Sequence, residues 1–134
     1  MKRQICNKII LGIIVMVVSA VALAETTESN ALVGKWAGSD SFPNGAKLET
    51  IVTINADSSF VGSATVNNKP FWDYSGTWVV KDHKIIWTYV TSSRPIPETA
   101  KVDTDEIISV SDKQLNLKSQ LSGKAHTFDR VSPP

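Results

Sequence analysis

YSGTWVVKDHKIIWTYVT, residues 74–91, is the stretch that decides the fold. Two runs within it, Tyr74–Lys81 and Lys84–Thr91, alternate large apolar residues with other residues. A period of two with aromatic and β-branched residues is typical of strands, and nothing here recurs at helical spacing. Asp82 and His83 lie between the runs and fit a tight hairpin turn. The residues expected on the inner face of this hairpin are Trp78, Val80, Ile85, Trp87 and Tyr89.

Short strand-like runs continue on both sides of the hairpin, at residues 32–36, 47–54, 60–66, 106–110, 114–119 and 125–130. Turn clusters such as Pro43-Asn44-Gly45 separate them, and no convincing helix is present. Eight short antiparallel strands predict an all-β sandwich or closed barrel. We favour an eight-stranded antiparallel up-and-down barrel, because closure removes unpaired strand edges.

The first 24 residues have the pattern of a cleaved secretion signal. Basic residues precede an apolar run, Ile9–Val18, and the small residues Ala22 and Ala24 stand where a signal peptidase reads. The alternative is a transmembrane anchor, but Ile9–Ala24 is shorter than the ~20 residues that a spanning helix needs. We expect an exported protein, periplasmic or secreted, with no membrane span after cleavage.

The chain after position 24 is expected to form a flexible leader (25–31), one barrel (32–131) and a short tail (132–134). The only cysteine in the sequence, Cys6, lies inside the signal and is lost with it. Neither lipidation at the cleavage site nor a disulfide is therefore expected. Loss of three basic residues with the signal leaves the chain slightly acidic, which argues against a nucleic-acid partner. The expected strands are mostly too short for an outer-membrane barrel, which needs ~9–11 residues per strand.

Several short motifs, taken in order, resemble those of the short bacterial lipocalin-like (calycin) domains. They are Gly34 with Trp36, Asn55 with Asp57 before Phe60, Gly76-Thr77-Trp78, and Phe128 with Arg130. The resemblance spans about residues 32–131. It implies that Gly34, Trp36 and Arg130 close one barrel end, with the guanidinium packed on the indole. The Thr-Asp-Tyr loop motif of larger lipocalins is missing, and the short chain leaves less room for a cavity.

The sequence predicts no enzyme, metal site or cofactor. His83 falls in a turn and His126 in the last strand, and no serine has a nucleophile-elbow context. The acidic cluster from Asp103 to Glu106 lacks the spaced ligands and the glycine of a calcium loop, so we expect a solvated loop there.

The aromatic residues give the candidate binding site. Large side chains are needed simply to fill a small barrel. The alternative is that some of them line a mouth that holds a small hydrophobic or amphipathic ligand. The stiff segment around Pro95 and Pro97 would lie at that mouth, with Arg94 meeting an acidic head group. The predicted ligand-binding residues are Trp72, Tyr74, Trp78, Trp87, Tyr89 and Arg94.

A second function class remains open from the sequence. A barrel with a filled interior would fit a periplasmic protein-interaction or inhibitor module, because small calycin-like barrels include protease inhibitors. Such inhibitors usually carry a disulfide, which this chain lacks after cleavage. An interior cavity walled by Trp78 and Trp87 would favour ligand binding instead.

Overall fold

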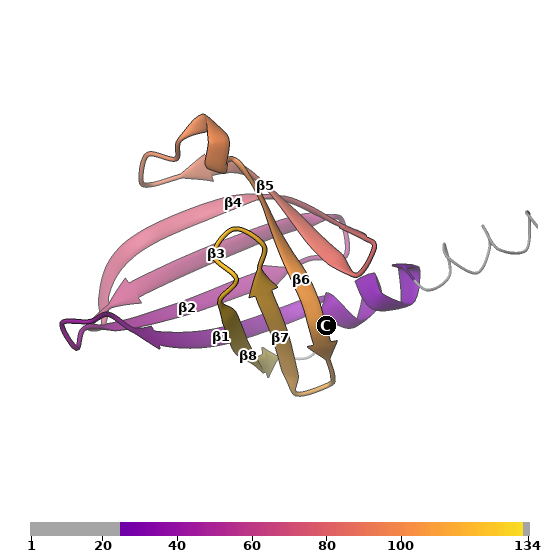
Figure 1. Cartoon of the computed structure of the whole chain (residues 1–134), viewed down its shortest axis with the longest axis horizontal. Helices are drawn as coiled ribbons and strands as arrows, with labels where there is room; N and C mark the ends of the chain where they lie inside the picture. Colours follow the sequence, from indigo (N-terminus) through magenta and orange to yellow (C-terminus); the bar gives the residue numbers. More distant parts are fainter. Residues whose placement is uncertain (1–24, 133–134) are drawn as a thin grey trace, which may run out of the picture.

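The computed structural model describes residues 25–132, and the predicted signal at positions 1–24 lies outside them. Eight antiparallel strands follow one another around a closed barrel (Figure 1). They are β1 (Gly34–Ser41), β2 (Lys47–Ile54), β3 (Ser59–Val66), β4 (Lys69–Lys81), β5 (Lys84–Ser92), β6 (Val102–Val110), β7 (Gln114–Ser119) and β8 (Ala125–Ser132). The predicted all-β up-and-down barrel is therefore confirmed.

The central hairpin forms as the sequence predicts. Lys81 pairs with Lys84 around Asp82 and His83, whose φ angles of 54° and 58° suit a two-residue hairpin turn. Trp78 pairs directly with Trp87, and both indoles are buried. The alternation of inward and outward residues therefore predicted the inner face of this hairpin correctly.

Three strands extend at one end by four or more residues beyond their predicted limits, while β3, β5 and β8 gain one or two residues, so that Ser132 belongs to β8 and not to the predicted tail. β1 runs to Ser41, β4 begins at Lys69, and β6 begins at Val102. The predicted solvated loop at residues 103–106 is wrong, because this segment is part of β6 and pairs with β5. Charged residues there obscured the strand, although Asp103, Asp105 and Ile107 share one face at a period of two.

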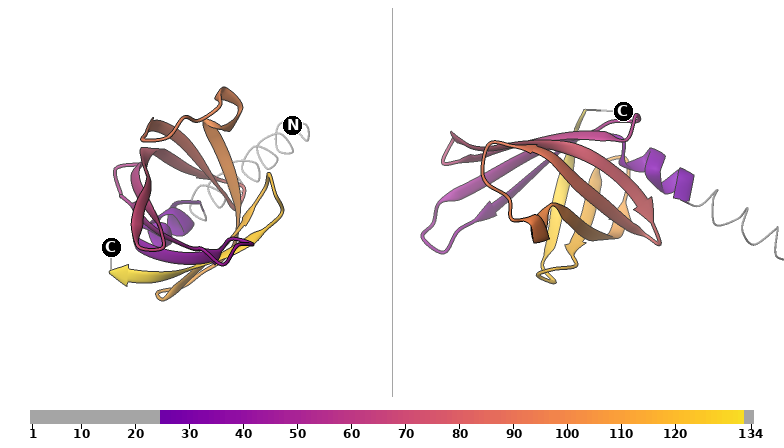
Figure 2. Two further views of the ribbon diagram at one scale, coloured as in Figure 1. Left: turned by 90° about the vertical axis from the view of Figure 1, so that its left-hand side faces the viewer. Right: turned by 90° about the horizontal axis from the view of Figure 1, so that it is seen from above.

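Residues 25–32 are helical, where the sequence analysis expected a leader without regular structure. This N-terminal helix lies across one end of the barrel (Figure 2, left). The last residue of the helix, Leu32, is fully buried in the core. Gly34 then turns the chain into β1 with φ 142°, a value that side chains disfavour. Within residues 25–132, no helix is long and apolar enough to cross a bilayer.

The two barrel ends differ. The closed end carries the N-terminal helix and the turns β2–β3, β4–β5 and β6–β7. The opposite end, called the mouth below, carries the connections at residues 42–46, 67–68, 93–101 and 120–124. The connection between β5 and β6 includes a short 3₁₀ turn, η1 (Glu98–Ala100), and it stands out from the barrel in Figure 1.

Trp36 and Arg130 join the first and last strands at the closed end. They are paired residues of β1 and β8, and Arg130 Cζ lies 4.1 Å from the centre of the Trp36 ring. Arg130 also donates to the carbonyls of Ala31 and Val33 at 2.9 and 2.8 Å, while Trp36 Nε1 donates to Leu32 O at 2.8 Å. These bonds satisfy carbonyls that the end of a helix leaves unpaired. The contacts of Trp36 and Arg130 thus connect the N-terminal helix, β1 and β8.

Replacing Trp36 by alanine should lower the free energy of unfolding by roughly 3–5 kcal/mol, because the indole is fully buried and its loss leaves a cavity. Urea unfolding followed by circular dichroism measures the change. Val90→Ala is the matched control, since Val90 is 70% exposed, and it should change stability by less than about 0.5 kcal/mol. A loss below about 1 kcal/mol for Trp36→Ala would contradict the closing role.

Candidate functional site

The barrel encloses a cavity of about 140 Å³ beneath its mouth. Aromatic and aliphatic side chains form most of the wall, with one threonine and one carboxylate among them. The lining residues are Thr50, Val52, Phe60, Tyr74, Trp87, Tyr89, Asp105, Leu115, Leu117 and Phe128. The interior is therefore incompletely filled, and seven of the eight strands contribute to its wall.

A wider groove of about 420 Å³ lies outside the cavity, between the β5–β6 connection and the β7–β8 loop. Trp72, Ile96, Asp103 and Leu121 are among its lining residues. Tyr89 lines both the groove and the cavity, so this residue lies between the two spaces.

The aromatic rings are packed against one another in a fixed arrangement. Phe60 meets Trp87 edge-on with ring centres 4.9 Å apart, and Tyr74 meets Tyr89 in the same way at 5.6 Å. Trp72 lies on Tyr74 at 4.1 Å and donates from Nε1 to Ser92 Oγ at 2.7 Å. Edge-to-face contacts and indole hydrogen bonds orient such rings. The wall is therefore preorganised.

Glycines make room for two of the wall rings. A Cβ atom at Gly62 would lie 2.1 Å from the ring of Tyr74 across the β3–β4 pair, and one at Gly38 would lie 2.8 Å from the ring of Phe128. Both distances are far below van der Waals contact. The rings can lie flat against the barrel wall only because these positions lack a side chain.

Asp105 is the only charged residue in the cavity wall. Trp87 Nε1 donates to its Oδ2 at 2.9 Å. Burial raises the pKa of Asp105, the Trp87 hydrogen bond opposes that shift, and the nearby Asp103 carboxylate adds to it. Asp103 lies two residues earlier in β6 and therefore on the same face of the strand.

Both tyrosines of the chain belong to this wall. Burial raises the pKa of Tyr74 to about 12, and it raises that of Tyr89 further, because neighbouring Asp103 and Asp105 also disfavour a phenolate. Tyr89 is thus next to the acidic pair, and both hydroxyl groups are neutral at ordinary pH.

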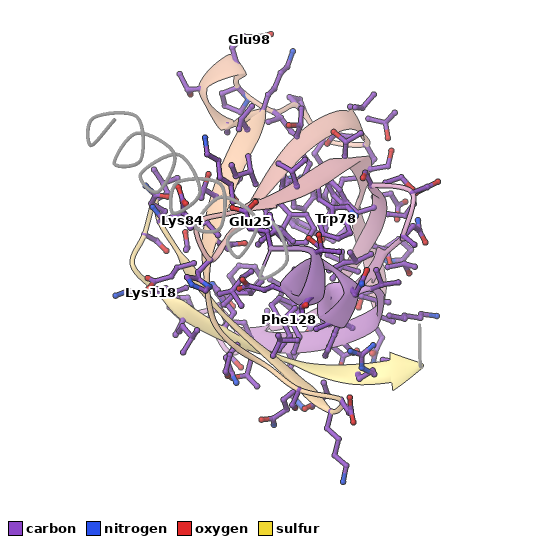
Figure 3. All side chains as sticks on the ribbon, turned by 90° about the vertical axis from the view of Figure 1, so that its right-hand side faces the viewer. Glu25, Trp78, Lys84, Glu98, Lys118 and Phe128 are labelled. Atoms are coloured by element: carbon purple, nitrogen blue, oxygen red, sulfur yellow. The ribbon has the colours of Figure 1, made fainter. Side chains whose placement is uncertain are left out.

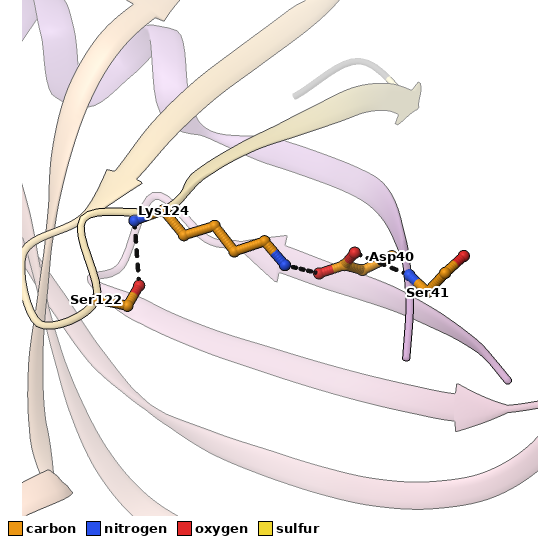
Figure 4. Close-up of polar contacts among 4 residues, drawn as sticks. All are labelled: Asp40, Ser41, Ser122 and Lys124. Atoms are coloured by element: carbon orange, nitrogen blue, oxygen red, sulfur yellow. Dashed lines mark hydrogen bonds and ion pairs between the residues drawn. The ribbon is translucent and has the colours of Figure 1, made fainter. Parts of the chain in front are cut away.

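The rim carries a separate carboxylate that is already paired. Lys124 Nζ lies 2.7 Å from Asp40 Oδ2, which joins the end of β1 to the loop before β8 (Figure 4). This hydrogen bond lowers the pKa of Asp40, with a further contribution from the Ser41 backbone N–H. Asp40 and His126 line a second pocket of about 170 Å³, which shares Thr50 and Phe128 with the cavity wall.

The structure brings together four of the six residues predicted to bind a ligand. Tyr74, Trp87 and Tyr89 line the cavity, and Trp72 and Tyr89 line the groove. Trp78 lies at the closed end near the N-terminal helix (Figure 3), where its Nε1 donates to the carbonyls of Asn55 and Ser59.

Arg94 does not line the cavity or the groove. Its guanidinium lies 4.0 Å from the centre of the Phe71 ring and donates to Phe71 O. Phe71 is exposed, and a register shift in the β3–β4 pairing marks its position. The predicted contact of Arg94 with an acidic head group thus has no counterpart in the lining of either space.

The two histidines lie at opposite ends of the barrel. His83 is in the β4–β5 turn, where its Nδ1 lies 3.0 Å from Glu28 Oε2 of the N-terminal helix. His126 is in β8 near the mouth. The described part of the chain contains no group of three or more His, Cys, Asp or Glu side chains placed to hold a metal ion.

Sequence analysis missed the acidic members of the site. Asp103 and Asp105 were assigned to a solvated loop, although their spacing from Ile107 carried a strand signal. A strand extended backward from Ile107 would have placed both carboxylates inside the barrel.

Residues 25–132 form one antiparallel β-barrel with a small aromatic cavity beneath its mouth. No family model and no curated protein matches the chain. An NMR structure of a protein from Bacteroides uniformis is similar, with a TM-score of 0.56 and 14% sequence identity, over 78% of this chain and 92% of that one. This likeness shows the fold alone, and the lipocalin-like resemblance stays a prediction.

Tyrosine ionisation offers a direct test of burial in the site. Absorbance at 295 nm should show almost no phenolate in the folded protein at pH 11, whereas the urea-unfolded chain should titrate near the ordinary value of 10.0. Because folding raises these pKa values, the tyrosines stabilise the fold fully below about pH 10, and that contribution is lost as the pH rises toward 12. Tyr74→Phe should remove the ionisation step that occurs at the lower pH in the folded protein. Native titration near pH 10 would contradict the burial.

Asp105→Asn should raise the free energy of unfolding at pH 7 by roughly 0.5–1 kcal/mol. The amide oxygen can still accept from Trp87, while the cost of holding a charge in the wall disappears. Because folding raises the pKa of Asp105, the gain should vanish once the pH falls below the ordinary aspartate value of 3.8. Urea unfolding at pH 7 and pH 3 measures both effects. Asp73→Asn, on the exposed face of β4, is the control, and a destabilised Asp105→Asn would refute this account.

Proposed function

We propose that this protein is an exported, lipocalin-like binding protein that holds a small hydrophobic or amphipathic molecule at the mouth of its barrel. The observation that carries the proposal is the aromatic cavity of about 140 Å³, which shares the lining residue Tyr89 with the wider groove. An apolar cavity of about 150 Å³ is large enough to bind benzene. The cavity thus suits one six-membered ring, and the groove suits the remainder of the molecule.

Export rests on the signal pattern in the first 24 residues, which lie outside the described part of the chain. Binding without catalysis is favoured by the separation of the two histidines and by a wall of aromatic rings. The alternative function, a protein-interaction or inhibitor module, was tied to a filled barrel. Trp87 lines the cavity and Trp78 does not, so only one of the two walls expected from the sequence is present, and the unfilled space beneath the mouth supports the ligand-binding proposal.

Nuclear magnetic resonance of the four indole N–H groups can test binding and locate it at once. Toluene and benzyl alcohol should shift the signals of Trp87 and Trp72, which line the cavity and the groove. The signals of Trp36 and Trp78 at the closed end should not move. Fatty acids, retinol and haem form the second half of the panel, and we expect them to bind more weakly because the cavity admits only one ring.

Thr50→Phe should abolish the shifts, because Thr50 lines the cavity and a larger side chain there would fill it. Thr53→Phe is the matched control, since Thr53 lies on the opposite face of β2. Failure of every compound to shift the Trp87 and Trp72 signals would overturn the proposal and favour the inhibitor alternative. Equal binding by Thr50→Phe would place the ligand elsewhere.

A further inference from the structure

The charged residues that line the cavity and the groove are both acidic. Asp105 lines the cavity and Asp103 lines the groove, while neither set of lining residues contains a lysine or arginine. The ion pairs formed within residues 25–132 are His83 with Glu28, Lys101 with Glu98, and Lys124 with Asp40. The two inner carboxylates therefore lack the basic partner that the rim carboxylate, Asp40, possesses.

An inward carboxylate without a countercharge is costly, because partial burial removes water that would stabilise the anion. Burial raises the pKa of Asp105, the nearby Asp103 carboxylate raises it as well, and His126 opposes the shift. Hydrogen bonds within the described chain use Asp105 Oδ2, which accepts from Trp87, and Asp103 Oδ1, which accepts from Thr104 N–H. One oxygen of each carboxylate is left to accept from a bound molecule.

The rings around these carboxylates suit the same kind of molecule. Tyr89 lines both spaces, and burial keeps its hydroxyl group neutral beside the acidic pair. Trp87 and Tyr74 complete an aromatic wall around Asp105. The faces of aromatic rings carry partial negative charge and attract ammonium groups, most strongly where water is excluded. Ring faces and carboxylates thus favour a cation and disfavour an anion.

We propose that the ligand of this barrel carries a protonated amine next to an apolar ring, with the ammonium group between Asp103 and Asp105 and the ring in the aromatic cavity. This inference rests on the proposed ligand-binding function and adds the charge of the ligand to it. The opposite expectation, an acidic head group held by Arg94, finds no support in the lining, because Arg94 is stacked on Phe71. Asp103 and Asp105 are successive inward residues of β6, roughly 7 Å apart along the strand backbone, so both carboxylates lie on the same side of the proposed ligand site.

Three probes share a phenyl ring and differ in charge: benzylammonium, benzyl alcohol and benzoate. Comparing them distinguishes the contribution of the charge to affinity from that of the ring. The full exported chain is titrated with each at pH 7, with Trp87 and Trp72 indole signals as the readout. Benzylammonium should bind about tenfold more tightly than benzyl alcohol, as expected for a charge-assisted hydrogen bond in a partly buried site. Benzoate should bind more weakly than either benzylammonium or benzyl alcohol. High salt should reduce only the benzylammonium affinity.

Asp105→Asn should remove most of the preference for benzylammonium, while benzyl alcohol keeps its affinity. Asp103→Asn should have a smaller effect in the same direction, because Asp103 lies farther out, in the groove. Asp73→Asn removes a carboxylate from the outer face of β4 and should leave all three affinities unchanged. A urea unfolding curve for each variant checks that it is folded.

The outcomes distinguish this inference from the proposed function. Binding of benzyl alcohol with equal or weaker binding of benzylammonium would overturn the charge preference and leave the aromatic pocket in place. A preference that survives in both aspartate variants would also overturn it. Failure of all three probes and of toluene to shift the Trp87 signal would overturn the pocket itself.

Discussion

The contact between Trp36 and Arg130 is the one on which the rest of the barrel depends. An up-and-down barrel closes only if its first and last strands meet, although they are far apart in sequence, and such contacts form against a large loss of chain entropy. Here the indole and the guanidinium come from paired positions of β1 and β8. The same guanidinium binds the carbonyls at the end of the N-terminal helix. One side chain therefore closes the barrel and fixes the helix that covers its end.

The packing of that closed end contrasts with the aromatic cavity near the mouth. The core around Trp36 includes the buried side chains of Leu32, Ile54 and Ile85. Nearer the mouth, the wall is made of tyrosine rings lying over strands that carry glycine and threonine at inward positions. The rings hold one another edge-to-face and do not collapse into the remaining space. The cavity therefore lies on the mouth side of the buried core around Trp36, where a ligand from solvent would approach.

The sequence predicted the fold well because alternation and turn chemistry are local signals. The hairpin around Asp82 and His83 and the inward placement of Trp78 and Trp87 could be read directly from spacing. The helix at residues 25–32 could not, since it is short and polar and depends on burying Leu32 at the barrel end. Asp103 and Asp105 were missed for a related reason. Carboxylates suggest solvent, and this expectation outweighed the period-two spacing from Ile107 that places both of them on the inward face of β6.

The same barrel also decides which way the site faces. The described chain enters at residue 25 beside the closed end, and Ser132 pairs with Lys35 next to the same end. Both attachment points therefore lie at the end opposite to the connections that frame the mouth. Anything joined to either point, whether a surface, a second domain or an affinity tag, would leave the mouth directed away from the support. Immobilisation through a terminus thus preserves access to the cavity.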